Sequence, residues 1–289
     1  MFIDLIGIFF AFLATIGYGL SSATAKIPVK EFGNIPTIFF RNILATLIIF
    51  IIMLATTLGY TFNMDAAVFT LLLSIIGYLG LIFLYKALHS AKVGVILPIL
   101  SSTSIFTIVF SFIFFQEVLP AKKLLPIFLI ISGVMLFSVQ FKDFRNSQIF
   151  KKQSGIVYAL ATCILWGLMF AFIRIPVKSF GPIYTSFFIE AGVLVLSFFT
   201  LIVTRVKIKI PPKPLHLHIG LVAIFTVMGT VFFNVAAKYI SVSIVSAVSA
   251  TRSLVAALYA KKVLKEEFEP KQLVAILLSV VGLITLSLS

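Results

Sequence analysis

The sequence predicts an all-α polytopic membrane protein in which ten transmembrane helices form two inverted five-helix repeats. Three observations lead to this prediction: an apolar composition, apolar runs long enough to cross a bilayer, and an internal duplication. Of the 289 residues, 61% are hydrophobic and 11% are charged, whereas soluble domains carry about 25% charged residues. With a mean hydropathy of +1.19, the chain is expected to be an integral, multi-pass protein of the cell membrane.

Ten apolar runs follow one another along the chain, each about as long as a helix that crosses the hydrocarbon core of a bilayer. They cover approximately residues 4–25, 35–57, 66–87, 93–115, 120–140, 154–174, 182–204, 215–237, 242–261 and 270–288. Most of the connections between them are short, which is typical of antiparallel neighbours in a helix bundle.

The duplication is visible as a direct alignment of the two halves of the chain. Residues 7–50 lie over residues 155–198 without a gap, and the tetrapeptide Ile-Pro-Val-Lys at 27–30 returns at 175–178. Self-similarity with a period of half the chain indicates two copies of one unit. We predict that the first repeat covers residues 1–145 and the second covers residues 146–289.

Each predicted repeat holds five apolar runs, which is an odd number, so the second repeat must enter the membrane from the opposite side. The two halves are then related by a two-fold axis in the membrane plane. In such proteins the substrate site lies between the halves, near the middle of the bilayer.

The basic residues determine which partners to expect. The formal net charge is +14, but most Lys and Arg lie in short loops, where they set topology and contact anionic lipid. We therefore expect membrane lipid, and no nucleic acid, as a partner. One side of the membrane carries only Lys122, Lys123, Arg174, Lys178 and Lys238, so the positive-inside rule places both chain termini outside the cytoplasm.

Residues for metal, cofactor or enzymatic chemistry are few. Cys163 is the only cysteine and lies inside an apolar run, and His216 and His218 have no carboxylate or cysteine beside them. These residues are not enough to predict a metal site. Because the sequence has no Walker, HExxH, GxSxG or CxxC pattern, we predict no cofactor and no enzyme.

Ionisable residues deep in apolar runs are the informative ones, because each is costly unless it is paired or faces water. Arg252 lies about 15 Å from either surface, either facing a cavity to hold a carboxylate or phosphate, or forming a structural ion pair. Glu190, about 12 Å deep, is the partner of Arg252, a proton-coupling carboxylate or the acceptor for a substrate ammonium. Its counterpart is Asn42, and the neighbouring Arg41, only five residues past Pro36, is expected to snorkel to the interface.

Five further residues are candidates for the lining of a substrate cavity. Tyr18, Tyr85 and Trp166 offer aromatic surfaces, although aromatic residues in a chain with 32 phenylalanines more often serve packing. Asn234 is a candidate hydrogen-bond donor to substrate, with cross-helix bonding as the alternative. Ser249 is one of several hydroxyl residues around Arg252.

Motifs at matching places in the two halves resemble the drug/metabolite transporter superfamily, in its EamA-like branch. These are Tyr18-Gly19 with Lys26, Trp166-Gly167 with Arg174, Glu117 and Glu266 before the last helix of each half, and Gly133 and Gly282 within those helices. The resemblance spans nearly the whole chain. It implies a secondary transporter of small polar metabolites such as amino acids, with a central cavity and alternating access.

Two further comparisons follow from this resemblance. Nucleotide-sugar and sugar-phosphate exchangers of the superfamily have a basic residue fourteen positions before the acidic residue that precedes the last helix. Arg252 and Glu266 resemble this pair, which implies an anionic or carboxylate-bearing substrate. Members of the superfamily usually have cytoplasmic termini, which is the reverse of the orientation that the charges predict.

We therefore predict an exporter or exchanger of a small polar metabolite, such as an amino acid or another carboxylate or anion. Arg252 is its expected anchor and Glu190 the partner or coupling group, with protons as a candidate coupling ion. The alternatives are a proton-coupled exporter of cationic or lipophilic compounds, of the multidrug type, and a channel or lipid scramblase. The sequence leaves the substrate, the direction of transport and the oligomeric state open.

Overall fold

The computed structural model describes residues 2–56, 61–91, 93–138, 155–206, 209–263 and 271–288, and over these residues the fold is entirely helical. The helices of the first half are α1 (Phe2–Thr24), α2 (Lys26–Phe32), α3 (Asn34–Thr56), α4 (Met64–Ser90), α5 (Val93–Ser101), α6 (Thr103–Phe115) and α7 (Ala121–Ser138). Those of the second half are α9 (Ile156–Phe180), α10 (Pro182–Val203), α11 (Lys213–Tyr239), α12 (Val242–Ser249), α13 (Arg252–Val263) and α14 (Lys271–Leu288). The predicted boundary between the repeats, at residues 145 and 146, lies outside the described residues.

Seven helical segments in the described part of the chain are long and apolar enough to cross a membrane. They are Ile3–Phe32, Asn34–Thr56, Met64–Ser90, Ile156–Phe180, Pro182–Val203, Lys213–Tyr239 and Val242–Val263. Two shorter apolar segments, Ile99–Phe115 and Leu277–Leu286, accompany them. The prediction of an integral, multi-pass membrane protein is therefore confirmed, whereas the predicted number of ten crossings stays a prediction.

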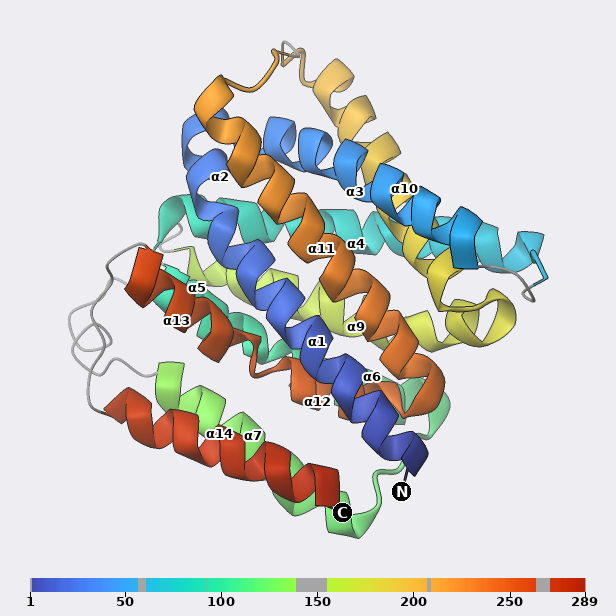
Figure 1. Cartoon of the computed structure of the whole chain (residues 1–289), viewed down its shortest axis with the longest axis vertical. Helices are drawn as coiled ribbons and strands as arrows, with labels where there is room; N and C mark the ends of the chain where they lie inside the picture. Colours follow the sequence, from blue (N-terminus) through green and yellow to red (C-terminus); the bar gives the residue numbers. More distant parts are fainter. Residues whose placement is uncertain are drawn as a thin grey trace.

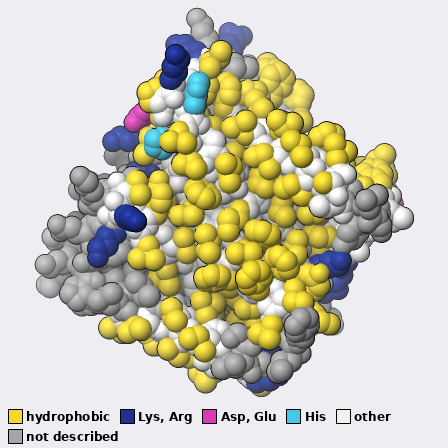
Figure 2. Space-filling model, in the orientation of Figure 1, with side chains coloured by type: hydrophobic (Ala, Val, Ile, Leu, Met, Phe, Trp, Pro, Cys, Tyr) yellow, Lys and Arg dark blue, Asp and Glu magenta, His cyan; other side chains and the backbone are white. Residues whose placement is uncertain are grey.

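The outer surface agrees with a lipid environment. Figure 2 shows a broad band of hydrophobic side chains over the middle of this face, with Lys, Arg and His side chains near its edges. Large apolar side chains such as Phe9, Leu47, Ile51 and Leu72 are more than half exposed. In water such a continuous apolar surface would be unfavourable, but in a bilayer it faces lipid tails.

The two halves repeat a detail of the backbone as well as the order of their helices. Gly33, which links α2 to α3, has φ 99° and ψ 163°, and Gly181, which links α9 to α10, has φ 96° and ψ 165°. This region of conformational space is open almost only to glycine. The Phe-Gly pair that recurs in the sequence therefore makes the same tight connection in both halves.

Helices of one half pack mainly on helices of the other. In Figure 1, α1 lies along α11, α3 beside α10, and α7 against α14 at one end of the molecule, and α4 packs on α9. Two of these contacts are matched: Tyr18 on α1 sits on Gly229, and Trp166 on α9 sits on Gly80. A β-carbon at Gly229 would approach Tyr18 Cδ1 to 2.5 Å, so glycine is needed for the close approach of α1 and α11.

Two predicted runs, 93–115 and 242–261, are each divided into two helices near the middle. The first breaks between α5 and α6 and the second between α12 and α13. The two breaks touch, because Ser101 Oγ donates to the carbonyl of Ala250 at 2.5 Å. Polar side chains thus serve backbone groups that a broken helix leaves without an internal partner.

Candidate functional site

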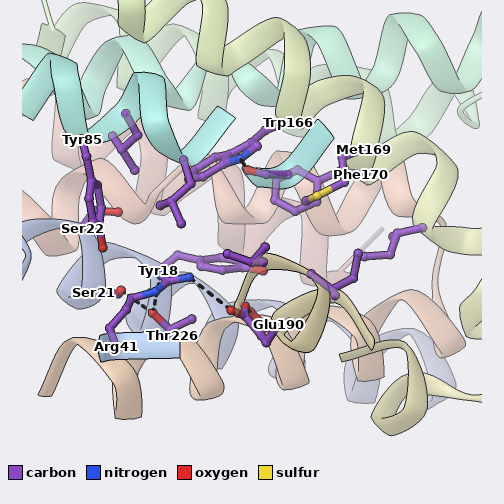
Figure 3. Close-up of a pocket in the computed structure, with 17 residues that line it drawn as sticks. Tyr18, Ser21, Ser22, Arg41, Tyr85, Trp166, Met169, Phe170, Glu190 and Thr226 are labelled. Atoms are coloured by element: carbon purple, nitrogen blue, oxygen red, sulfur yellow. Dashed lines mark hydrogen bonds and ion pairs between the residues drawn. The ribbon is translucent and has the colours of Figure 1, made fainter. Parts of the chain in front are cut away.

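A cavity of about 70 Å³ lies between the two halves. Its walls come from α1, α3 and α4 of the first half and from α9, α10 and α11 of the second. Its polar side chains are Ser21, Ser22, Arg41, Glu190, Thr226 and Thr230, and its aromatic ones are Tyr18, Tyr85, Trp166 and Phe170. In Figure 3, the Arg41–Glu190 pair lies on one side, with Trp166, Met169 and Phe170 on the other.

An ion pair between the halves dominates the polar side. Arg41 NH2 lies 3.1 Å from Glu190 Oε2, and the two side chains are 7% and 6% exposed. Arg41 also donates from Nε to Asn42 Oδ1 at 2.7 Å and from NH1 to Thr226 Oγ1 at 3.0 Å. The guanidinium is therefore fixed by bonds from three of its nitrogen atoms.

The Glu190 carboxylate is held equally firmly. Its Oε2 also accepts from Asn42 Nδ2 at 2.8 Å, and its Oε1 accepts from Thr230 Oγ1 at 2.9 Å. Asn42 Nδ2 in addition contacts the Glu190 backbone carbonyl at 3.0 Å. Charge-assisted hydrogen bonds of this kind compensate part of the cost of burying a carboxylate.

These contacts correct two expectations. Arg41 does not snorkel to the interface, because its side chain is buried and points into the cavity. It is the eighth residue of α3, about 10 Å from the helix start, and Glu190 lies at a similar depth in α10. The ion-pair partner of Glu190 is Arg41, so of the three alternatives for Glu190, the one in which it pairs with Arg252 is wrong.

Of the seven predicted site residues, Tyr18, Tyr85, Trp166 and Glu190 line the cavity. Trp166 is oriented by a hydrogen bond from Nε1 to the Gly77 carbonyl at 3.0 Å. The Tyr85 hydroxyl is buried without a hydrogen-bond partner among the described residues, and Figure 3 shows it on the cavity side, near Ser22. It is therefore a polar group that a bound molecule could satisfy.

The other three predicted residues lie outside the cavity wall. Asn234 Nδ2 donates to Ser186 Oγ at 2.8 Å, and Ser249 is buried. Arg252 is 4% exposed and its guanidinium stands over the Trp166 ring, 5.7 Å from the ring centre. Contacts of these three side chains with a substrate stay predictions.

The sequence argument missed Arg41, Ser21, Thr226 and Thr230 as cavity residues. Ser21 Oγ and Thr226 Oγ1 are 2.8 Å apart, which joins α1 to α11 beside the Arg41 guanidinium. A signal for Arg41 was available, because the repeat places its neighbour Asn42 at the position of Glu190. Nothing in the local sequence distinguishes the two threonines from others that only bond to their own helix.

These features define a multi-pass membrane protein with a small cavity between two similar halves, largely apolar but with one polar side. A model of the EamA-like transporter family matches residues 5–139 and again residues 153–288. The chain therefore belongs to the EamA-like transporter family, which is part of the drug/metabolite transporter superfamily. Its resemblance to this family, predicted from the sequence motifs, is confirmed.

Two individual proteins are also similar to this chain. Uncharacterized protein MJ1333.1 of Methanocaldococcus jannaschii is 26% identical over 127 residues, which is 44% of this chain and 92% of that protein. A protein of known crystal structure aligns with a TM-score of 0.71 and 16% identity, over 99% of this chain and 96% of the other. At this identity the likeness concerns the fold alone.

Proposed function

We propose that the chain is a secondary transporter of a small polar metabolite, such as an amino acid or another carboxylate or anion. The metabolite would bind in the cavity between the halves and cross the membrane by alternating access. The observation that carries the proposal is the buried Arg41–Glu190 pair at the cavity wall, 3.1 Å apart. Ionisable groups within a membrane are costly and, where they face a cavity, usually belong to a substrate or ion pathway.

The hydrogen-bond capacity of the pair supports a substrate that accepts hydrogen bonds. Glu190 already receives three side-chain donors, from Arg41, Asn42 and Thr230. A guanidinium has five N–H groups, and Arg41 uses three of them in the side-chain bonds described above. The polar wall thus retains donors for a carboxylate, while Trp166 and Phe170 can contact the apolar part of the same molecule.

Protons are the coupling ion that we propose. A substrate carboxylate at Arg41 would bring a second negative charge beside Glu190, and two close carboxylates are not both ionised without a large electrostatic cost. Uptake of a proton by Glu190 would remove this repulsion. Besides Glu190, the titratable groups that line the cavity are the Arg41 guanidinium on α3 and the phenols of Tyr18 on α1 and Tyr85 on α4.

We further propose that the halves, residues 1–145 and 146–289, are inverted copies with ten crossings. In this arrangement α1 with α2, α5 with α6, and α12 with α13 each cross as one bent segment. Equivalent residues make equivalent contacts, which supports the proposal: Thr15 Oγ1 donates to the Val248 carbonyl at 3.3 Å. Its counterpart Cys163, 148 positions later, donates from Sγ to the carbonyl of Ile99, the counterpart of Val248, at 3.2 Å.

Contacts between a residue and its own counterpart are a second support. Asn42 bonds Glu190 across 148 positions, Ser101 bonds Ala250 across 149, and Arg252 bonds Thr103 across 149. A residue can touch its own counterpart only close to the axis that relates two copies. These contacts are therefore expected along a two-fold axis through the middle of the molecule.

Ligand-induced thermal stabilisation of the purified protein tests the proposed substrate class. The panel contains amino acids, organic acids, sugar phosphates, nucleotide sugars and organic cations, because a ligand that binds only the folded state raises its stability by mass action. We expect stabilisation by a carboxylate or zwitterion that is lost in Arg41→Gln. Arg174→Gln is the matched control, since it removes another ion-paired arginine, bonded to Glu117 at 2.9 Å, away from the cavity.

Counterflow in proteoliposomes then tests transport itself. Saturable exchange of the stabilising compound, reduced in Arg41→Gln and Glu190→Gln, is the expected result. Rapid flux that does not saturate would instead indicate a channel or scramblase. Stabilisation by organic cations alone, lost in Glu190→Gln and kept in Arg41→Gln, would replace the proposal by a multidrug-type exporter.

A further inference from the structure

Arg252 is a buried charge that the cavity does not explain. It is the first residue of α13, directly after the break that follows α12. Its NH2 donates to the Leu100 carbonyl at 2.6 Å and to Thr103 Oγ1 at 3.0 Å. Among the described residues, no ion pair with a carboxylate involves Arg252, so its charge is compensated in another way.

The compensation comes from the end of α5. Leu100 is in the last turn of this helix, which ends at Ser101, and the last four carbonyls of a helix have no partner within it. The C-terminal end of a helix also carries a partial negative charge, which favours a cation beside it. Arg252 therefore caps α5 from the other half of the protein, at the point where the two broken helices cross.

The other side of the same guanidinium reaches the cavity wall. It stands 5.7 Å from the centre of the Trp166 ring, a distance at which a cation is attracted by an aromatic face. The ring is held on its edge by the Gly77 carbonyl at 3.0 Å and packs on Gly80. Trp166 lines the cavity and Arg252 does not, so Arg252 acts on the cavity through the ring.

Among the described residues, no cation–π contact at Tyr18 matches this support in the other half. The counterpart of Arg252 is Thr103, which has no cationic group, and the counterpart of Trp166 is Tyr18. Tyr18 packs on Gly229, just as Trp166 packs on Gly80. The guanidinium is therefore an addition to a shared arrangement, and it strengthens the wall that Trp166 forms.

We infer that Arg252 is a positioning residue, which links the crossing of the broken helices to the cavity by fixing the Trp166 ring. Broken helices at mid-depth often accompany the binding sites of transporters, and here a single side chain connects the break to the wall. The significance of this link for substrate rests on the proposed function. The positioning itself can be tested without any substrate.

Trp166 makes the test direct, because it is the only tryptophan of the chain. Fluorescence of purified full-length protein, excited at a wavelength that tryptophan absorbs and tyrosine does not, therefore reports on one ring, and acrylamide quenching measures how accessible that ring is. A cation–π contact in a desolvated site biases the ring position by roughly thirtyfold. In Arg252→Met we expect the quenching constant of Trp166 to rise by roughly twofold or more, with an intermediate rise in Arg252→Lys.

The matched control is Arg174→Met, which removes a guanidinium 4.8 Å from the centre of the Phe115 ring and should leave Trp166 quenching unchanged. Unchanged quenching in a folded Arg252→Met protein, or an equal rise in the control, would overturn the inference. If Arg252→Met does not fold, as judged by size-exclusion chromatography and circular dichroism, Arg252→Lys decides by the same criterion. If the proposed transport function is wrong but the positioning role is right, quenching will still rise in Arg252→Met. No compound of the panel will then stabilise the protein.

Discussion

Removing either member of the Arg41–Glu190 pair should cost far more stability than a surface ion pair does. Both side chains are less than a tenth exposed, and breaking a buried pair by removing one partner costs about 3–5 kcal/mol. Arg41→Met leaves the Glu190 carboxylate with Asn42 and Thr230 only, and Glu190→Leu leaves the guanidinium with Asn42 and Thr226. If the two costs were independent, the double variant would lose about 6–10 kcal/mol.

The double variant should lose much less. Without either charge, the remaining cost is that of the neutral Asn42 and Thr230 groups, which lose an acceptor at about 1–3 kcal/mol each. We therefore expect a total loss of about 2–6 kcal/mol and a favourable coupling energy of about 3 kcal/mol or more. At roughly 2 °C per kcal/mol for a chain of this size, each single change should lower Tm by about 6–10 °C.

Thermal unfolding in lipid nanodiscs, followed by far-UV circular dichroism, measures this cycle. The control cycle uses Arg174→Met and Glu117→Leu, whose side chains are 24% and 11% exposed, and its coupling should be smaller, about 1 kcal/mol. Additive losses at Arg41 and Glu190, or equal coupling in both cycles, would refute the reasoning that the cavity pair is desolvated.

Three further predictions concern single side chains. Gly181→Ala should lower the free energy of unfolding by about 1–3 kcal/mol, because φ 96° and ψ 165° are strained for any residue with a β-carbon. The control in the same thermal assay is Gly220→Ala, where nothing lies within 4 Å of the new carbon. Gly229→Ala should push the Tyr18 ring away, since the new carbon would lie 2.5 Å from Cδ1. Ligand-induced stabilisation should then weaken, and an unchanged ligand response would contradict a role of Tyr18 in ligand binding. Tyr85→Phe should leave Tm of the empty protein unchanged or slightly higher, because it removes a buried hydroxyl without a described partner, yet lower ligand affinity; a large drop in Tm would argue against this.

The helices of the fold could be predicted well because hydropathy is a local property. Apolar runs predicted the helices to within a few residues in most places. The additional helix α2 (Lys26–Phe32) was not predicted, since its sequence contains a proline and three charged residues. In the structure it continues the path of α1, so the apolar segment extends from Ile3 to Phe32.

The site could be predicted only in part, because depth along a helix does not specify a partner. Glu190 was identified from its depth, but its partner Arg41 is 149 positions away and was assigned to the interface by counting from Pro36. The helix begins at Asn34, which places Arg41 two turns inside it. For Arg252 the depth was sufficient to predict burial, whereas the direction of its side chain depends on the break after α12.

The contacts between counterparts explain why the two copies differ at their most polar positions. Glu190 faces Asn42 at 2.8 Å and Arg252 faces Thr103 at 3.0 Å, with 148 or 149 positions between them. Two identical copies would bring two carboxylates, or two guanidinium groups, together in a buried place, where like charges repel strongly. Beside the two-fold axis that we propose, a duplicated chain can therefore keep a charge in one copy only, and must replace it in the other by a neutral side chain that bonds to it. Positions where an otherwise similar repeat exchanges a charged residue for an amide or a hydroxyl are, by this argument, the positions closest to the proposed two-fold axis.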